Sequence, residues 1–197
     1  IMSRIEPGIP LSDSIMNFIT GVKVFFDEND DGLKDLLVGN FHRYIPNLDK
    51  EGTIALYSNS GSTTNPEFTY IDYNYLNLSQ QSYGLRLAPT FGDIDGDGDE
   101  DMYVGTANGS LMYFENTSVG SGAVFNTPQL NITDNLGSVI DPGLYSFPQL
   151  FDLNDDNLLD LIIGVRTGEL YYYENIGTTN APVFELMNSM LGQVDVS

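Results

Sequence analysis

Cysteine is absent from this sequence, and histidine occurs once, at position 42. Without cysteine the chain has no disulfide framework and no thiol nucleophile, although this leaves its redox compartment open. A single histidine gives a histidine-dependent serine site little to work with. His42 lies beside Arg43 in an inserted loop, where a lone histidine is more often a bystander than a catalyst. We therefore expect that the chain is not an enzyme.

Basic residues are also scarce. Seven Lys and Arg stand against 28 Asp and Glu, so the formal net charge at pH 7 is −21. A chain this acidic repels phosphate backbones and anionic surfaces, so we expect no nucleic-acid partner and no membrane insertion. No apolar run has the length of a membrane span, and no segment has the pattern of a signal peptide. We expect the chain to be an excised or mature interior segment.

The acidic residues are concentrated in three nine-residue segments, 27–35, 93–101 and 152–160, which hold 15 of the 28. Each segment has Asp or Asn at positions 1, 3 and 5, Gly or Asn at position 6, and Asp at position 9. In a tightly turned loop, alternating side chains converge on one point, and glycine permits the positive φ of the turn. Hard oxygen ligands at this density favour Ca²⁺ over other metals.

We therefore predict about three calcium ions, one in each segment. The residue at position 7 would offer its backbone carbonyl oxygen, as in other Asp-rich calcium loops. The predicted ligands are Asp27, Asn29, Asp31, Leu33, Asp35, Asp93, Asp95, Asp97, Asp99, Asp101, Asp152, Asn154, Asp156, Leu158 and Asp160. An EF-hand needs a bidentate Glu at position 12, but that position holds Val38, Val104 or Ile163, which excludes an EF-hand.

Other interpretations of the acidic and aromatic residues are weaker. A solvated acidic linker needs neither a fixed register nor an apolar run behind each segment. A glycosidase pair needs one carboxyl group kept protonated against an apolar wall, whereas these carboxylates are spaced to bind a cation. The aromatic run Tyr171–Tyr173 fits packing between sheets better than a sugar platform.

The three segments mark an internal repeat. Asp27 and Asp93 are 66 residues apart, and Asp93 and Asp152 are 59 apart. The surplus falls between Gly39 and Gly52, where an insertion at Phe41–Lys50 lengthens a hairpin loop. This insertion carries basic and aromatic residues, so we predict that it is the main partner contact.

Each repeat has the pattern of four short strands. Leu36–Val38 and Leu161–Ile163 are apolar at consecutive positions, which indicates strands covered on both faces, as in small stacked sheets. Glycine, Asn and Ser clusters between the strands are typical of turns. The predicted organisation is an outer strand or connection from a preceding unit (1–20), followed by repeat 1 (21–82), repeat 2 (83–144) and repeat 3 (145–197).

The order of motifs resembles the FG-GAP/VCBS repeat family. Each copy has a Pro-led strand or its counterpart, the Asp-rich loop, an apolar run ending in Gly, a turn, and an aromatic strand ending in Asn. The resemblance implies an all-β fold of about three four-stranded β-propeller blades, with a calcium loop between the first two strands of each blade. Similar repeats build the heads of integrin α chains and many secreted bacterial surface proteins.

The chain departs from this pattern in two ways. Asn157 replaces the glycine of the third loop, although asparagine tolerates the left-handed conformation better than most residues. Three blades also cannot close a ring, because propellers have roughly four to eight. We therefore expect further blades of the same protein, or an assembly, to cover the open faces.

The resemblance implies a calcium-stabilised interaction scaffold of a secreted or cell-surface protein, with a role in adhesion and a protein or glycan ligand. One alternative is a structural spacer within a larger surface protein. Another is a non-catalytic part of a propeller-type polysaccharide-degrading enzyme. The flanking sequence would separate these alternatives, since it would show the number of blades and the neighbouring domains.

Overall fold

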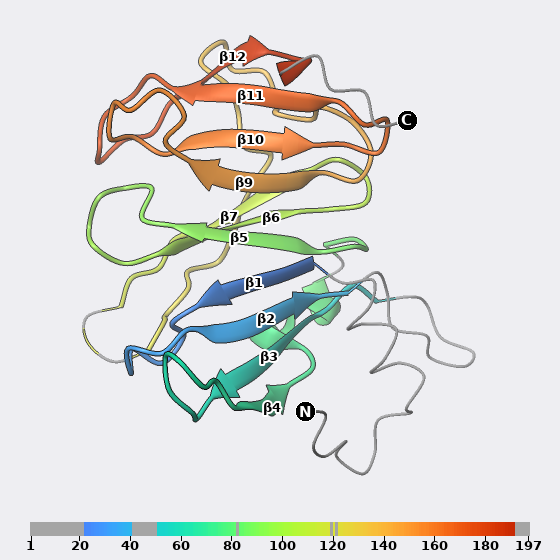
Figure 1. The fold of residues 1–197 in the computed structure, drawn as a ribbon. Coiled ribbons are helices and arrows are strands. Elements are labelled where there is room, and N and C mark those ends of the chain that lie inside the picture. The colour runs from blue at the N-terminus through green and yellow to red at the C-terminus, as the bar shows by residue number, and fades with distance from the viewer. Residues whose placement is uncertain (1–21, 41–50, 82, 119, 121, 192–197) are drawn as a thin grey trace.

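A computed structural model describes residues 22–40, 51–81, 83–118, 120 and 122–191. Twelve strands in this part of the chain form three four-stranded antiparallel sheets, each with its strands in sequence order (Figure 1). The predicted all-β fold of four-stranded units is confirmed. The N-terminal segment 1–20 and the insertion Phe41–Lys50 lie outside the described residues, so the predictions made for them remain predictions.

The three sheets follow one another along the chain. The first contains β1 (Val22–Phe26), β2 (Asp35–Gly39), β3 (Ile54–Asn59) and β4 (Phe68–Asp72). The second contains β5 (Ala88–Gly92), β6 (Asp101–Gly105), β7 (Leu111–Phe114) and β8 (Gln129–Leu130). The third contains β9 (Phe147–Phe151), β10 (Asp160–Gly164), β11 (Leu170–Asn175) and β12 (Phe184–Asn188). Each sheet lies inside one predicted repeat, but the boundaries between repeats stay a prediction.

The described part of the chain contains one short helical segment of several residues. The 3₁₀ segment η1 (Tyr75–Gln81) follows β4 and is interrupted at Leu76 and Asn77, which have positive φ. No helix in the described part of the chain has the length and apolar character needed to cross a membrane.

Two apolar clusters hold the stack together. The first contains Leu37 and Ile54 of the first sheet with Met102 and Val104 of the second. Because side chains alternate along a strand, Tyr103 points the other way and joins the second cluster, between the second and third sheets. Burial of each large apolar side chain contributes about 1.5–3 kcal/mol. The middle sheet is therefore covered on both faces, as its consecutive apolar residues require.

Glycine at the end of the second strand allows the next blade to approach closely. A Cβ atom on Gly39 would overlap the carbonyl oxygen of Leu87, and one on Gly105 would overlap that of Ser146. Leu87 and Ser146 lie in the segments that enter β5 and β9. The apolar run that ends in glycine thus reflects the contact between blades.

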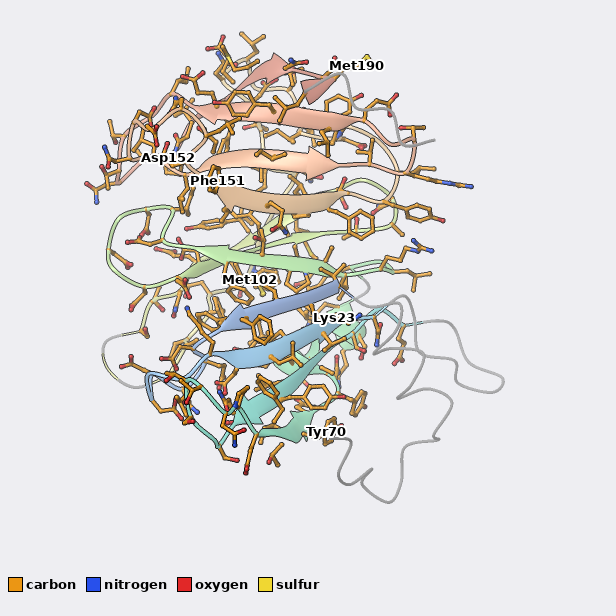
Figure 2. All side chains as sticks on the ribbon, viewed as in Figure 1. Lys23, Tyr70, Met102, Phe151, Asp152 and Met190 are labelled. Atoms are coloured by element: carbon orange, nitrogen blue, oxygen red, sulfur yellow. The ribbon has the colours of Figure 1, made fainter. Side chains whose placement is uncertain are left out.

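The first strands of the three sheets run in the same direction, so the Asp-rich loops that follow them all lie at one end of the strands (Figure 1). The strands β1, β5 and β9 run toward the Asp-rich loops, which lie on the left in Figure 1. The segments that enter β5 and β9 lie at the opposite end. Figure 2 shows Asp152 at the loop end and Lys23 at the other end.

The fourth strand of the second sheet is shorter than the repeat predicts. Asn116 and Phe125 form only an isolated bridge, and β8 then covers two residues. Pro128 precedes β8 and has no N–H to donate to a ladder. The following segment, 131–141, instead turns toward the third sheet, where Ile132 and Ile140 are buried in the second cluster.

Candidate calcium sites

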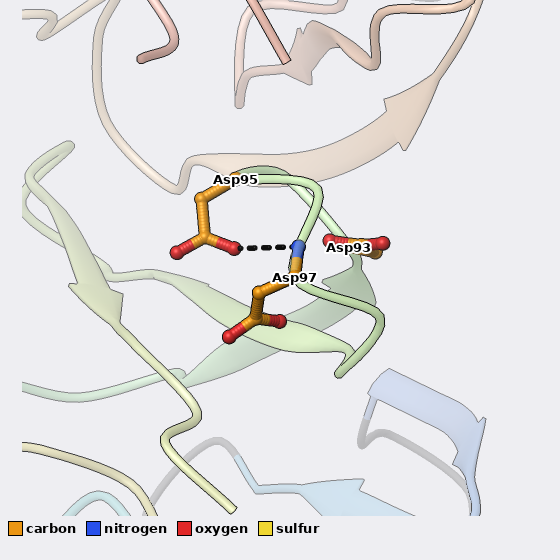
Figure 3. A group of neighbouring side chains, drawn as sticks. All are labelled: Asp93, Asp95 and Asp97. Carbon is orange, nitrogen blue, oxygen red and sulfur yellow. Dashed lines mark hydrogen bonds between the residues drawn. The ribbon is translucent and has the colours of Figure 1, made fainter. Parts of the chain in front are cut away.

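The three Asp-rich loops occupy equivalent places in the sheets. Loop 1 (27–35), loop 2 (93–101) and loop 3 (152–160) connect the first strand of each sheet to the second. In loop 2, Asp93, Asp95 and Asp97 each offer a carboxylate oxygen, and these three oxygens lie within 4.8 Å of one another (Figure 3). This donor set of convergent hard oxygens fits Ca²⁺.

The carboxylate at position 1 shapes each loop by accepting two backbone hydrogen bonds. Asp27 accepts from Asp31 N at 3.1 Å and Gly32 N at 2.9 Å. Asp152 accepts from the same two positions, Asp156 N at 3.1 Å and Asn157 N at 2.9 Å. Asp93 accepts from Gly98 N at 3.2 Å and from Gly96 N, one position earlier in the loop, at 2.7 Å. The backbone therefore orients this side chain in all three loops.

Positions 3 and 5 make local turns of the same kind. Asp95 accepts from Asp97 N at 3.3 Å, the bond drawn in Figure 3. Asn29 and Asn154 accept from the position 5 amide at 3.0 and 3.1 Å. The position 5 carboxylate accepts from the N–H of position 7, with N···O distances of 2.9, 2.9 and 2.8 Å for Leu33, Asp99 and Leu158. The predicted use of the position 7 carbonyl as a ligand stays a prediction.

Two positions of each loop have positive φ. At position 6 the values are 83° for Gly32, 102° for Gly98 and 69° for Asn157, so asparagine takes the conformation that its place in the motif requires. Position 4 is also left-handed, with 58° for Asp30, 73° for Gly96 and 61° for Asp155. The motif did not reveal this second position because aspartate fills it in two copies.

The aspartate at position 9 has a structural role in the loop. Asp35, Asp101 and Asp160 are fully buried. The side chain of Asp101 accepts from Asn116 N at 2.8 Å, Tyr113 Oη at 3.1 Å and Ile94 N at 3.4 Å. The structure does not bring Asp101 into the group formed by Asp93, Asp95 and Asp97. Its carboxylate closes the base of the loop.

The same arrangement recurs in the other two loops. Asp35 accepts from Asn59 N at 2.7 Å and Glu28 N at 3.2 Å. Asp160 accepts from Asn175 N at 2.9 Å and Leu153 N at 3.0 Å. Tyr172 Oη donates to Asp160 at 3.0 Å, while Tyr171 and Tyr173 pack in the second apolar cluster.

A buried asparagine completes this arrangement. Asn116 donates from Nδ2 to the carbonyl oxygen of Glu100 at 3.3 Å and accepts at Oδ1 from Ser118 N and Val124 N. Asn59 and Asn175 make equivalent bonds. We call each pair of a position 9 aspartate and the asparagine at or just after the end of the third strand the Asp–Asn clasp. The sequence shows the recurring asparagine, but its role depends on the strand register.

Crowding of carboxylates perturbs loop 2. Burial, and to a smaller extent the charge of Asp95, raise the pKa of Asp101 to about 6, although the hydrogen bond from Asn116 N lowers it. Burial also raises the pKa of Asp95, and the charges of Asp97 and Asp93 add to this effect. A divalent cation placed among these groups would offset their repulsion.

Contacts with the next blade also position the loops. Ala123 N of the second repeat donates to Glu28 O in loop 1 at 2.7 Å. Asn180 Nδ2 of the third repeat donates to Asp95 O in loop 2 at 3.0 Å. Lys34 and Glu100 join loops 1 and 2 by an ion pair of 2.8 Å. Loops 1 and 2 are therefore held in place partly by contacts with the next repeat.

Loop 3 differs from loop 2 in its position 3 side chain. Asn154 Nδ2 donates to Asp156 Oδ2 at 2.9 Å and to Glu174 Oε1 at 3.2 Å. The loop therefore has one carboxylate fewer, and one oxygen of Asp156 is held by an amide.

The chain is similar to known proteins over these same segments. Residues 27–104 match the sequence model of the FG-GAP-like repeat family. Integrin alpha-3 of Cricetulus griseus is 30% identical over 145 residues, which cover 70% of this chain and 13% of the integrin. No solved structure matches the chain significantly. The resemblance identified from the motifs is confirmed, and the chain carries FG-GAP-like repeat sequence.

Proposed function

We propose that the chain is a calcium-stabilised part of a β-propeller and serves as an interaction scaffold of a secreted or cell-surface protein. The observation that carries this proposal is the convergence of three carboxylates within 4.8 Å in loop 2, on a loop shape that recurs in loops 1 and 3. The similarity to integrin alpha-3 supports the extracellular setting.

The residues at positions 1, 3 and 5 would hold each ion. In loop 2 these are Asp93, Asp95 and Asp97, supplemented by the carbonyl oxygen at position 7 and by the position 9 carboxylate where it can also reach the ion. Bound calcium supplies positive charge that links the strands on either side of the loop. The chain's own backbone N–H groups orient the carboxylates before binding, which lowers the ordering cost.

We propose that the surface outside the Asp-rich loops binds a macromolecule and does not carry out catalysis. The loop carboxylates are engaged by loop N–H groups, and each position 9 carboxylate is held in an Asp–Asn clasp. Loops that extend from rigid sheets are common sites of recognition. We propose that a protein or glycan ligand binds at the end of the stack away from the acidic loops, where the charge repels it least.

The test is a pull-down from extracellular material together with a glycan array, both with the calcium-loaded chain. We expect a specific ligand in one of the two assays and its loss in EDTA. If neither assay detects a ligand, the result would favour a spacer role and contradict the proposal. A ligand bound equally in EDTA would contradict calcium dependence.

A further inference from the structure

Three side chains gather at the end of the stack opposite the Asp-rich loops. Arg86 and Tyr145 lie two residues before β5 and β9, and Arg166 lies two residues after β10. The intervening strands have five residues, so these side chains are about 16 Å from the loops along the strand axis. Figure 2 shows the two ends of the stack at Asp152 and Lys23.

The ring of Tyr145 lies close to both guanidinium groups. The Cζ atom of Arg86 is 4.2 Å from the ring centroid, and that of Arg166 is 5.4 Å from it. Both distances are within the range of a cation–π interaction. The two cations thus share one aromatic ring.

The backbone holds this arrangement in an unusual conformation. Arg86 and Tyr145 occupy equivalent positions in their repeats, three residues before Pro89 and Pro148, and both have positive φ, 55° and 61°. Neither side chain favours that region, so the fold maintains the conformation at some cost. Backbone bonds fix the segment, because Tyr145 N donates to Ala107 O at 3.1 Å and Arg166 N donates to Leu144 O at 2.9 Å.

These cations stand out in a chain with a net charge of −21. Lys34, at the loop end, is paired with Glu100. In the described part of the chain, no carboxylate lies within the 4.0 Å ion-pair distance of Arg166, whose side chain is exposed. Asp141 lies near the adjacent turn at Gly109 but forms no ion pair with Arg166. The guanidinium of Arg166 can therefore receive an anion.

We propose that Arg86, Tyr145 and Arg166 form a binding site for a carboxylate side chain of an acidic segment on a partner protein. Guanidinium groups over an aromatic ring keep their N–H donors at the edge, where a carboxylate accepts two of them at once. The ring of Tyr145 is half-buried and already lies close to two cations, which disfavours the stacking of a sugar on it.

The inference rests on the proposed scaffold role and names the chemistry of the ligand. Its test uses the full chain in calcium and two fluorescent peptides with blocked termini, hexaglutamate and hexaglutamine. We expect hexaglutamate to bind and hexaglutamine not to bind. Arg166→Gln should weaken binding of hexaglutamate by about tenfold or more, since a hydrogen bond to a charged group has roughly this effect. Arg166→Lys should restore part of the loss.

Lys34→Gln is the matched control because it removes the same charge at the other end of the stack. It should leave the affinity for hexaglutamate within about twofold of the original. An equal effect of Lys34→Gln and Arg166→Gln, or equal binding of both peptides, would overturn the site. Binding of an oligogalacturonate without binding of hexaglutamate would assign the site to an acidic glycan and would also overturn the proposal.

A parallel calcium titration separates this inference from the proposed function. Arg166→Gln should leave the calcium titration and the melting curve unchanged while it weakens peptide binding. If the unmodified chain binds hexaglutamate but does not bind calcium, the calcium proposal alone is contradicted. Calcium binding without binding of hexaglutamate would contradict the carboxylate site alone.

Discussion

Asn116 carries a large share of the hydrogen bonding at the base of loop 2, so its removal provides the first prediction. Asn116→Ala leaves the N–H groups of Ser118 and Val124 and the carbonyl of Glu100 without this partner. We expect the free energy of unfolding to fall by about 2–4 kcal/mol, because each unsatisfied buried group costs about 1–3 kcal/mol and the site can relax in part. Urea denaturation measures this change.

Asn126→Ala is the control for that variant. Asn126 is exposed, and its side chain donates only to Glu115 Oε2. Its replacement should change the free energy of unfolding by no more than about 0.5 kcal/mol. If the two substitutions lower the free energy of unfolding equally, the proposed contribution of the Asp–Asn clasp to stability would be contradicted.

Asp101 and Asp97 should respond differently to removal of calcium. Asp101 is held within the fold, so Asp101→Ala should destabilise the chain by about 3 kcal/mol in EDTA as well as in calcium. Asp97 is exposed and belongs to the convergent group, so the effect of Asp97→Ala should largely disappear in EDTA. Thermal melts of both variants with and without calcium measure the difference. An Asp101→Ala effect that vanishes in EDTA would show that this residue acts only as a ligand.

The residues of the candidate site were predictable to different degrees. Spacing alone predicted the convergence of Asp93, Asp95 and Asp97 and the positive φ at Asn157, because both depend on a local turn. The pairing of Asp101 with Asn116 depends on the register of two strands, which a spacing pattern does not contain. The cluster around Tyr145 joins separate repeats and depends on how the sheets stack.

The three loops, as elements, should bind calcium with unequal strength. Loop 2 offers one more carboxylate than loop 3, in which Asn154 donates to Asp156. We therefore expect Asp97→Ala to lower the Tm in calcium more than Asp156→Ala does. Binding stabilises the fold by about 2.7 kcal/mol per site at a hundredfold excess over Kd, which sets the scale of the loss. Equal Tm shifts in differential scanning calorimetry would contradict the ranking.

The strands were more predictable than their lengths. Consecutive apolar residues and the glycine at the strand end predicted β2, β6 and β10, since both features reflect sheets covered on two faces. The short β8 was not predicted from the repeat. The segment after it packs on the third sheet and so does not extend the hydrogen-bonded ladder of the second sheet.

The outer face of the third sheet exposes apolar side chains, so we expect copies of the chain to associate. Phe26 and Phe151 both precede position 1 of a loop, but Phe26 is 3% exposed and stacks on Phe91 of the next sheet, whereas Phe151 is 58% exposed. No sheet covers Phe151 among the described residues. We expect multi-angle light scattering to detect oligomers that grow with concentration and that Phe151→Ser reduces.

Leu136→Ser is the control for this measurement. Leu136 is 83% exposed, in the turn between Asp134 and Ser138, and does not belong to the outer face of the third sheet. Its replacement should leave the association unchanged. A monodisperse monomer of the unmodified chain at all concentrations would contradict the expectation that the open faces are covered by further blades or copies.

Calcium binding by the whole chain tests the central claim most directly. The measurement is a calorimetric titration of the metal-free chain with CaCl₂, paired with melting curves in calcium and in EDTA. Loops whose carboxylates converge should give saturable heat from more than one site, and calcium should raise the Tm. The absence of binding heat, together with melting curves that are identical in calcium and EDTA, would show that the three loops are only acidic turns.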